Sequence, residues 1–344
     1  MDRREKEIIK KIEEDLRLQK EKSIKAENLD SKWEFLISNE PKRFINPDLT
    51  INIDALRNFR KLTIFIPDEP DYNPSLLNLK NLISGRRRGI RKLLKECFKI
   101  IKQYNYEYLL KKYPCSKIGN PYIFKIGNYQ FTYRWAKHIY SLGLFKKILD
   151  NKLKENFTVL DIGSSYGIFS YLLKNEYPSS HQLLLDFPEQ LILAYYFLGM
   201  NFPDVKIAGF KEIMGLEKIE RNFIERYDFI LVPWFFYNKL ASQSIDIITN
   251  FASFGEMKRG WFEFYIKNEP FISARYFFTE NRFQSAPTYD TDLTILDYPL
   301  KDFKVLHFGI CPIFSHTYKG KFLFFSEKLY FSSQYFEFIG ERNV

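Results

Sequence analysis

Apolar residues along the chain fall into two alternating patterns. Short continuous runs of strand length, the first at 159–162, are each followed by a segment in which apolar residues recur every three or four positions. The first pattern is typical of a strand buried on both faces, and the second of a helix with one buried side. Their alternation predicts an α/β fold with a mostly parallel sheet. The further runs that predict strands lie at 181–186, 227–234, 245–248 and 271–282.

The N-terminal part of the chain follows a different pattern. Residues 1 to about 30 are rich in Lys, Glu and Arg, with apolar residues four apart, which predicts a solvated terminal helix, with a partner-binding coil as the alternative. Helical spacing returns over 74–101 and is interrupted by the basic segment 84–92, which is either a solvated turn or a phosphate site. We therefore expect a mainly helical region at 1–115 and the sheet domain at 116–344.

Two further features lie in the C-terminal quarter of the chain. Apolar residues, many of them β-branched or aromatic, are frequent in two segments, 304–312 and 321–330. This composition predicts a hairpin-like pair of strands at the edge of the sheet. Before them, 289–292 forms an acidic loop. A divalent metal would need further ligands that the sequence does not offer there, so no metal site is predicted.

The segment 158–174 carries the strongest chemical signal. A strand-length run ends at Gly163, and helical spacing resumes after Gly167. Because glycine has no Cβ, the backbone N–H groups of such a turn can approach a small polar ligand closely. The dinucleotide-binding fingerprint requires glycine at three positions, and Ser165 and Ile168 occupy two of them here. A nicotinamide or flavin dinucleotide is therefore not the expected ligand.

The spacing Asp161-x-Gly163-x-Ser165-x-Gly167 instead resembles the D-x-G-x-G-x-G loop of S-adenosylmethionine (SAM)-dependent methyltransferases, with serine for the middle glycine. In that family the acidic residue faces the methionine amino group, and a second acid, at the end of the next strand, binds the ribose hydroxyls. Asp186 stands at the position of this second acid. The predicted cofactor is SAM. The residues expected to bind it are Asp161, Gly163, Ser164, Ser165, Gly167, Asp186, Phe187, Trp234 and Asn250.

Other side chains follow the predicted strands toward the same edge of the sheet, where open α/β proteins bind ligands. Trp234 either stacks on adenine or packs in the core. Asn250, Ser253 and Glu256 follow the next strand, and helix capping is the alternative explanation for Ser253 and in part for Glu256. Arg134, on a helix that precedes the glycine loop, either meets the cofactor carboxylate or forms a structural salt bridge.

Five motifs recur in an order that is informative as a set: 118–121 (Ile-Gly-Asn-Pro), 159–167, 184–189 (Leu-Leu-Asp-Phe-Pro-Glu), 250–257 (Asn-Phe-Ala-Ser-Phe-Gly-Glu-Met) and 280–282 (Glu-Asn-Arg). This order resembles the sugar O-methyltransferase family found among bacterial surface-glycan genes, and the Asn-x-x-Ser-x-x-Glu-Met motif narrows the resemblance to it. The resemblance covers roughly residues 118 to 312. It implies a Rossmann-like class I methyltransferase sheet of seven strands, SAM as cofactor and a sugar hydroxyl as acceptor.

Methyl transfer to a sugar hydroxyl requires that its proton be removed, so a carboxylate or an imidazole is expected within hydrogen-bond reach. We assign Glu256 as the base or as a group that orients the acceptor, and we expect Ser253, Asn281 and Arg282 to bind the acceptor. His307 is the alternative base, with a purely structural role as the other explanation.

The composition limits the class of protein but does not indicate a function. The 344 residues, 45% of them apolar, can bury a large core, and the three cysteines show no metal-binding spacing, which predicts reduced, buried thiols. The longest apolar run is too short to cross a bilayer and no signal peptide is recognisable, so a cytoplasmic protein is expected.

The formal charge of +10 favours anionic partners. The aromatic residues are not interleaved with the basic ones, and no known nucleic-acid module is recognisable, so nucleic acid is not the expected partner. The expected partner is a glycan precursor or sugar nucleotide, with peripheral membrane contact left open and no indication of the oligomeric state. Two rival functions are an RNA methyltransferase and a non-catalytic protein of the same fold in glycan assembly.

Overall fold

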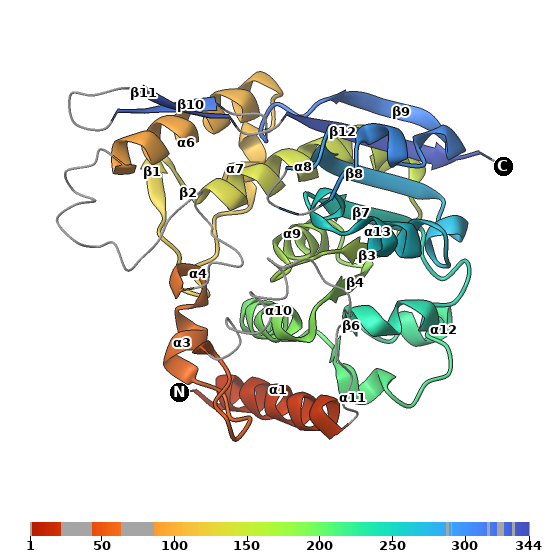
Figure 1. Cartoon of the computed structure of the whole chain (residues 1–344). Coiled ribbons are helices and arrows are strands. Elements are labelled where there is room, and N and C mark those ends of the chain that lie inside the picture. The colour runs from red at the N-terminus through yellow and green to blue at the C-terminus, as the bar shows by residue number, and fades with distance from the viewer. Residues whose placement is uncertain are drawn as a thin grey trace.

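A central sheet of eight strands organises the chain. The strands are β3 (Thr158–Ile162), β4 (His181–Asp186), β5 (Ile207–Ala208), β6 (Phe229–Pro233), β7 (Ile247–Phe251), β8 (Tyr276–Arg282), β9 (Phe303–Ile310) and β12 (Tyr335–Arg342). Their order in space is β5-β6-β4-β3-β7-β8-β12-β9 (Figure 1). Neighbours are parallel, except that β12 runs antiparallel to both β8 and β9.

This arrangement confirms the predicted α/β fold with a mostly parallel, Rossmann-like sheet. The sheet has one strand more than the seven expected, because the two residues of β5 pair with β6 at one edge. The computed structural model describes residues 2–21, 43–62, 86–286, 289, 291–314, 317–321, 327–331 and 334–343, and for 86–89, 317–321 and 327–331 it describes the backbone alone.

Helices cover both faces of the sheet (Figure 1). One layer consists of α8 (Tyr133–Leu149), α9 (Ile168–Glu176) and α10 (Pro188–Asn201), and the other of α11 (Phe210–Ile213), α12 (Arg221–Ile224) and α13 (Arg259–Ile266). Successive strand residues point to opposite faces. Val159 and Leu184 accordingly belong to the apolar core under the first layer, whereas Leu160 and Leu183 belong to the core under the second. Both cores explain why these strands are apolar throughout.

The N-terminal helix α1 (Arg3–Glu21) packs on the sheet domain, against α10 and α11. The Asp15 carboxylate accepts hydrogen bonds from the backbone N–H groups of Phe210 (2.8 Å) and Lys211 (2.9 Å). Glu5 accepts from the Tyr196 hydroxyl at 2.9 Å and pairs with Arg57 at 2.6 Å. The domain boundary near residue 115 stays a prediction.

The other N-terminal elements are short, apart from α6. They are α3 (Ile53–Arg57), α4 (Phe59–Leu62), α6 (Arg86–Gln103), α7 (Glu107–Lys112), β1 (Phe124–Ile126) and β2 (Tyr129–Phe131). Helices α6 and α7 contact α8, β1 and β2 lie beside α6, and α3 lies beside α1 (Figure 1). None of the helices in the described segments is both long and apolar enough to cross a lipid bilayer. The three cysteines are buried, and no disulfide joins them.

The predicted pairing of 304–312 with 321–330 is wrong. The strand β9 pairs instead with β12, the last strand of the chain, while β10 (Thr317–Lys321) and β11 (Glu327–Phe331) form a separate two-stranded sheet. The reason is burial: β12 lies between two strands and its first six residues are buried, so it gains more from the interior position than a hairpin at the edge would.

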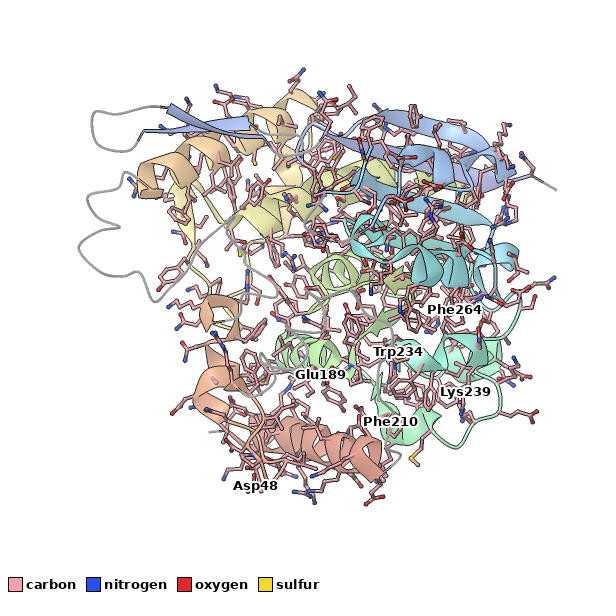
Figure 2. All side chains as sticks on the ribbon, viewed as in Figure 1. Asp48, Glu189, Phe210, Trp234, Lys239 and Phe264 are labelled. Carbon is pink, nitrogen blue, oxygen red and sulfur yellow. The ribbon has the colours of Figure 1, made fainter. Side chains whose placement is uncertain are left out.

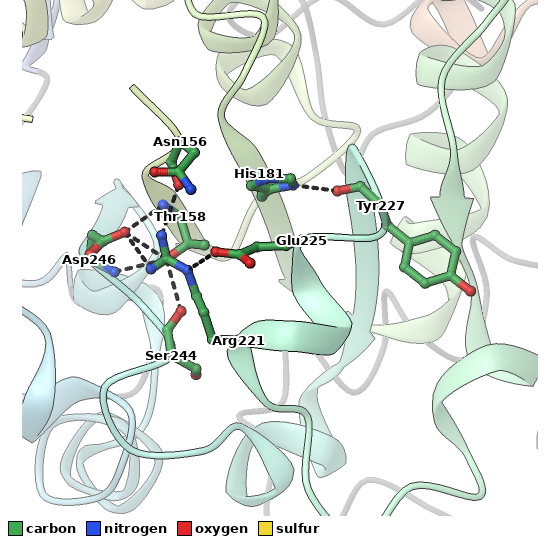
Figure 3. Close-up of polar contacts among 8 residues, drawn as sticks. All are labelled: Asn156, Thr158, His181, Arg221, Glu225, Tyr227, Ser244 and Asp246. Carbon is green, nitrogen blue, oxygen red and sulfur yellow. Dashed lines mark hydrogen bonds and ion pairs between the residues drawn. The ribbon is translucent and has the colours of Figure 1, made fainter. Parts of the chain in front are cut away.

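A polar network fixes the edge of the sheet at which the parallel strands begin (Figure 3). The Arg221 guanidinium pairs with Asp246 at 2.7 Å and donates to the carbonyl of Asn156 at 2.8 Å. The same Asp246 carboxylate accepts from the backbone N–H of Thr158, the first residue of β3, at 2.7 Å. This network lies at the opposite edge from the carboxyl ends of the strands, where ligands bind in such folds.

Candidate active site

A cavity opens at the carboxyl ends of β3, β4 and β7. Its walls enclose about 970 Å³ of space that no atom fills, including the open solvent at its mouth. Trp234, labelled in Figure 2, directly follows β6 and forms part of the wall. The sequence-predicted residues that line the cavity are Gly163, Ser165, Asp186, Phe187, Trp234, Ser253 and Glu256, together with Arg134.

The loop after β3 has the backbone that a glycine turn requires. Gly163 has φ +74°, and its N–H donates to the carbonyl of Leu185 at 2.8 Å. A Cβ built on Gly163 would lie 2.1 Å from the Ser253 hydroxyl oxygen, so no other residue fits without displacing that side chain. Gly167 has φ +83°, and its Cβ would meet the Leu184 side chain at 2.7 Å. Gly163 therefore shapes the cavity wall, whereas Gly167 lets α9 approach the sheet.

Ser165 also adopts a positive φ, of +57°, which is uncommon for a residue with a Cβ. Its backbone N–H donates to Oδ2 of Asp186 at 2.6 Å, and its hydroxyl accepts from Arg134 at 2.8 Å. These two contacts hold the loop in place. They also explain how serine occupies the position of the expected middle glycine.

Asp161 and Asp186 lie on the same face of the sheet. In the register of β3 and β4, Asp161 is opposite Leu184, and Asp186 is two residues further along the same strand as Leu184. Residues two apart share a face. Asp186 lines the cavity, but Asp161 is buried behind the loop and accepts from the Thr249 hydroxyl at 2.8 Å.

Burial changes the acidity of both carboxyls. It raises the pKa of Asp161 to about 7, and the neighbouring charge of Asp186 acts in the same direction. Burial also raises the pKa of Asp186 to about 6, against the effect of the N–H groups of Phe187 and Ser165. Two acids with raised pKa values beside a cavity are typical of a functional site. They gain stability in the ionised form when a cation or hydroxyl donors bind next to them.

Asn250 and Asn281 connect the loops around the cavity and do not line it. The Asn250 side chain donates to the carbonyl of Ile162 at 2.7 Å and accepts from the N–H of Phe254 at 3.0 Å. Asn281 donates to Oδ1 of Asn250 at 2.7 Å and accepts from the N–H of Gly255 at 3.1 Å. The sequence assigned these side chains to cofactor and acceptor, whereas the structure gives both a supporting position. Ser164, also assigned to the cofactor, is buried and outside the lining.

Glu256 lines the cavity and is held from behind by Arg282. The two side chains pair at 3.1 Å, and both are largely buried. The guanidinium of Arg282 also lies 5.1 Å from the ring centres of Tyr289 and Tyr335, which fixes its orientation. Ser253 stands at the start of the short helix η5 (Phe254–Glu256) without a capping bond from its side chain. Its hydroxyl instead faces Gly163.

His307 does not belong to this site. It lies on β9, the edge strand, and its Nε2 contacts Oε1 of Glu337 at 2.8 Å. Three strands, β7, β8 and β12, lie between β9 and β3 in the sheet order. The structure therefore gives His307 no access to the cavity and supports a structural role.

The sequence interpretation missed an aromatic wall of the cavity. Trp261 and Tyr265 lie four residues apart on α13, so they share one face of that helix. The rings of Trp261 and Trp234 meet edge to face with centres 4.8 Å apart. The spacing of these residues was a usable signal, but the same spacing is typical of core packing. The other unpredicted lining residues are Leu185, Gln190, Phe251, Ala252, Met257 and Lys258.

Two predictions from the sequence fall partly outside the described residues. Of the basic segment 84–92, the structure describes side chains only from Ile90 onward, so the proposed phosphate contact lies outside it. Of the acidic loop, Asp290 lies outside the described residues, while Asp292 pairs with Arg259 at 3.0 Å.

No family model and no curated protein sequence matches the chain. Solved structures that align with it include phosphoethanolamine N-methyltransferase 2 of Haemonchus contortus bound to SAM, with 12% identity over 42% of this chain and 28% of that one, and a TM-score of 0.28. A second structure of that enzyme is covered over 38% of its length, so the chain spans less than two-fifths of either.

Two other aligned structures are covered more fully. Precorrin-6y C5,15-methyltransferase of Geobacter metallireducens aligns over 62% of this chain and 90% of its own, with 13% identity and a TM-score of 0.32. A fibrillarin/Nop5p complex aligns over 67% and 91%, with 12% identity and a TM-score of 0.36. These identities and TM-scores are too low to indicate an activity for this chain.

Proposed function

We propose that this protein is a SAM-dependent methyltransferase that acts on a sugar hydroxyl of a surface-glycan precursor. The observation that carries the proposal is the cavity at the carboxyl ends of β3 and β4, where the Gly163 turn and the Asp186 carboxylate share one wall. A ligand with a ribose, an ammonium group and a flat base matches this combination of groups.

The residues of the cavity fit SAM part by part. The Asp186 carboxylate is positioned to accept hydrogen bonds from ribose hydroxyls, beside the apolar side chains of Leu185 and Phe187, which suit a flat base. Gly163 and Ser165 both line the cavity, and the lack of a Cβ on Gly163, which would overlap the Ser253 side chain, leaves this part of the wall to backbone atoms that suit an amino-acid moiety. Arg134 supplies a positive charge for its carboxylate, and Asp161 supplies a negative charge behind the loop for its ammonium.

Two features support a sugar as the acceptor. The first is the Asn250–Met257 motif, and the second is the part of the cavity wall that this motif and the following helix form. Glu256 and Lys258 place two charged groups in the lining beside Trp261 and Tyr265. Apolar aromatic faces with a few polar groups around them are suited to an acceptor that is polar at its edges. A sugar fits that description.

When bound, SAM would supply an electrophilic methyl group. The chain itself must hold the acceptor hydroxyl in line with that methyl group, and good alignment is worth about 7–11 kcal/mol in favourable model reactions. Glu256, which lines the cavity, accepts the hydroxyl proton in this proposal. Its ion pair with Arg282 fixes the position of the Glu256 side chain beside the acceptor.

The proposal is tested by measuring methyl transfer. Purified protein is incubated with SAM carrying a labelled methyl group and with sugar nucleotides, lipid-linked glycan precursors or RNA, and the products are analysed by mass spectrometry. Label on a sugar oxygen supports the proposal. Label on RNA would replace it with an RNA methyltransferase, and SAM binding without any transfer would favour a non-catalytic protein of glycan assembly. The cytoplasmic location expected from the sequence stays a prediction.

A further inference from the structure

A second cluster of reactive side chains lies away from the cavity, between α8 and the antiparallel edge of the sheet. It consists of Glu280 on β8, Glu337 on β12 and Cys311 just after β9. One donor atom from each of these residues lies within 4.8 Å of the others. The three side chains are almost completely shielded from solvent, with exposures of 0%, 2% and 0%.

The two carboxyls of this cluster oppose each other directly. Glu337 is the register partner of Glu280 on the neighbouring strand. Like charges at such a position destabilise a sheet, and buried carboxylates without a counter-charge cost several kcal/mol each. Within the described part of the chain, no ion pair joins Glu280 to a cation, and its Oε1 has no hydrogen-bond partner although it is buried.

The groups around the cluster satisfy only part of it. The Ser141 hydroxyl donates to Oε2 of Glu280 at 2.9 Å, and the Tyr140 hydroxyl donates to Glu337 at 2.9 Å. His307 contacts the same Glu337 carboxylate. Burial and the charge of Glu337 raise the pKa of Glu280 well above its usual value, although the positive charge of Lys137 acts in the opposite direction. A cation bound among the three donor atoms would offset the repulsion between the two carboxylates and would give Oε1 of Glu280 a partner.

We propose that Glu280, Cys311 and Glu337 supply three of the ligands of a bound zinc ion. Zinc accepts this mixture of thiolate and carboxylate ligands, and the harder cations calcium and magnesium do not favour the thiolate. Burial and the charges of Glu280 and Glu337 raise the pKa of the Cys311 thiol well above its usual value, while the backbone N–H groups of Phe314 and Ile313, directed at the sulfur, act in the opposite direction. On binding, the thiol proton and any proton on the carboxyls pass to solvent while zinc–sulfur and zinc–oxygen bonds form.

This site is independent of the proposed methyl transfer. The ion would join β8, β12 and the segment after β9, and so it would fasten the antiparallel edge of the sheet. His307 would orient Glu337 from behind, as histidines and carboxylates around metal ligands commonly do. Glu280 directly precedes Asn281 and Arg282, so the ion would also stabilise the strand end that supports Glu256.

The full-length protein, expressed with added zinc, tests the proposal by elemental analysis and by replacement of zinc with cobalt. We expect about one zinc ion per chain, a thiolate-to-cobalt absorption band, and a lower melting temperature after chelation. Cys311→Ser should lose the band, whereas Cys115→Ser, at another buried cysteine, should keep it. His307→Gln should bind zinc about 10- to 100-fold more weakly.

The proposal is overturned if the folded wild-type protein neither contains zinc nor shows the cobalt band. It is also overturned if the band persists in Cys311→Ser. The alternative is that a proton shared by the two carboxyls stabilises the cluster. Two results together would show this: chelators do not destabilise the protein, and the metal-free protein gives an infrared signal of a protonated carboxyl that disappears in Glu280→Gln. None of these outcomes depends on methyl transfer, so the two proposals fail separately.

Discussion

The backbone N–H of Ser165 donates to Oδ2 of Asp186 over 2.6 Å, which ties the loop after β3 to the end of β4. The other oxygen of the same carboxylate accepts from the N–H of Phe187 at 2.8 Å. One aspartate thus sets the shape of the loop and lines the cavity at the same time. A carboxylate oxygen can accept more than one hydrogen bond, so both oxygens can still accept from a ligand.

Replacing Asp186 with Asn should weaken SAM binding by about 1.5–3 kcal/mol, the usual contribution of a hydrogen bond to a charged group. The amide has one acceptor oxygen and no charge, so it cannot serve Ser165, Phe187 and a ribose together. Calorimetric titration measures the change. Glu189→Gln is the matched control, because Glu189 is a nearby acid outside the lining and its replacement should leave the affinity unchanged. Equal affinity of wild type and Asp186→Asn would remove Asp186 from the cofactor site.

Replacing Gly163 with Ala should reduce both SAM affinity and stability. The new Cβ would overlap the Ser253 hydroxyl, and a left-handed backbone costs a residue with a Cβ about 1–2 kcal/mol. Gly260→Ala is the control, since that glycine lies in α13 with open space around its Cβ position. There the change should stabilise the protein by about 0.4–1 kcal/mol. Thermal unfolding separates the two variants, and a neutral Gly163→Ala would contradict the close packing of the loop.

The affinity for SAM should increase as the pH rises. The pKa values of Asp186 and Asp161 are raised to about 6 and about 7, and only the ionised carboxyls attract an ammonium group or accept from two hydroxyls. Titrations between about pH 5 and pH 8 should show this increase, and Asp161→Asn should remove the part near pH 7. An affinity independent of pH would contradict these roles.

The stability of the ligand-free protein should change in the opposite direction. The folded state holds the protons of Asp161 and Asp186 more tightly than the unfolded state, whose ordinary value for such groups is 3.8. Their contribution to folding is therefore complete below about pH 4 and is lost as the pH rises through 6 and 7.

Replacing Glu256 with Gln should reduce methyl transfer by about 100-fold or more, the usual effect of removing a general base, and leave SAM affinity unchanged. The amide keeps the size of the side chain but loses the ion pair with Arg282 and the ability to take a proton. Glu263→Gln is the control, because Glu263 lies on α13 and pairs with Lys267 outside the cavity. Single-turnover rates and SAM titrations report the two effects separately, and unchanged turnover would exclude Glu256 from the chemistry.

The parts of the fold that could be predicted from the sequence are those encoded locally. Strand, glycine turn and helix at 158–174 depend on neighbouring residues, and the proline at position 188 begins α10 as its fixed φ predicts. Pairings between distant strands are not encoded in this way. The predicted partner of β9 was wrong because β9 pairs instead with β12, which begins some 25 residues further on in the chain. The burial of β12 favours this pairing, and no local pattern in the sequence reveals that burial.

The same distinction applies to the site. Gly163 and Asp186 could be predicted as residues that line the cavity, because each stands at the carboxyl end of a parallel strand, next to the cavity. Asn250 and Asn281 stand next to it in sequence, but their side chains turn toward each other and toward backbone groups. Trp261 was missed, since an aromatic residue at helical spacing has the same pattern whether it faces a core or a cavity.

Calorimetric titration of the purified protein with SAM shows whether the cavity beside Gly163 and Asp186 binds this cofactor. We expect saturable binding at one site per chain, weakened in Asp186→Asn and unchanged in Glu189→Gln. The absence of binding to the folded wild-type protein, or binding that Asp186→Asn and Gly163→Ala leave intact, would contradict SAM binding in this cavity.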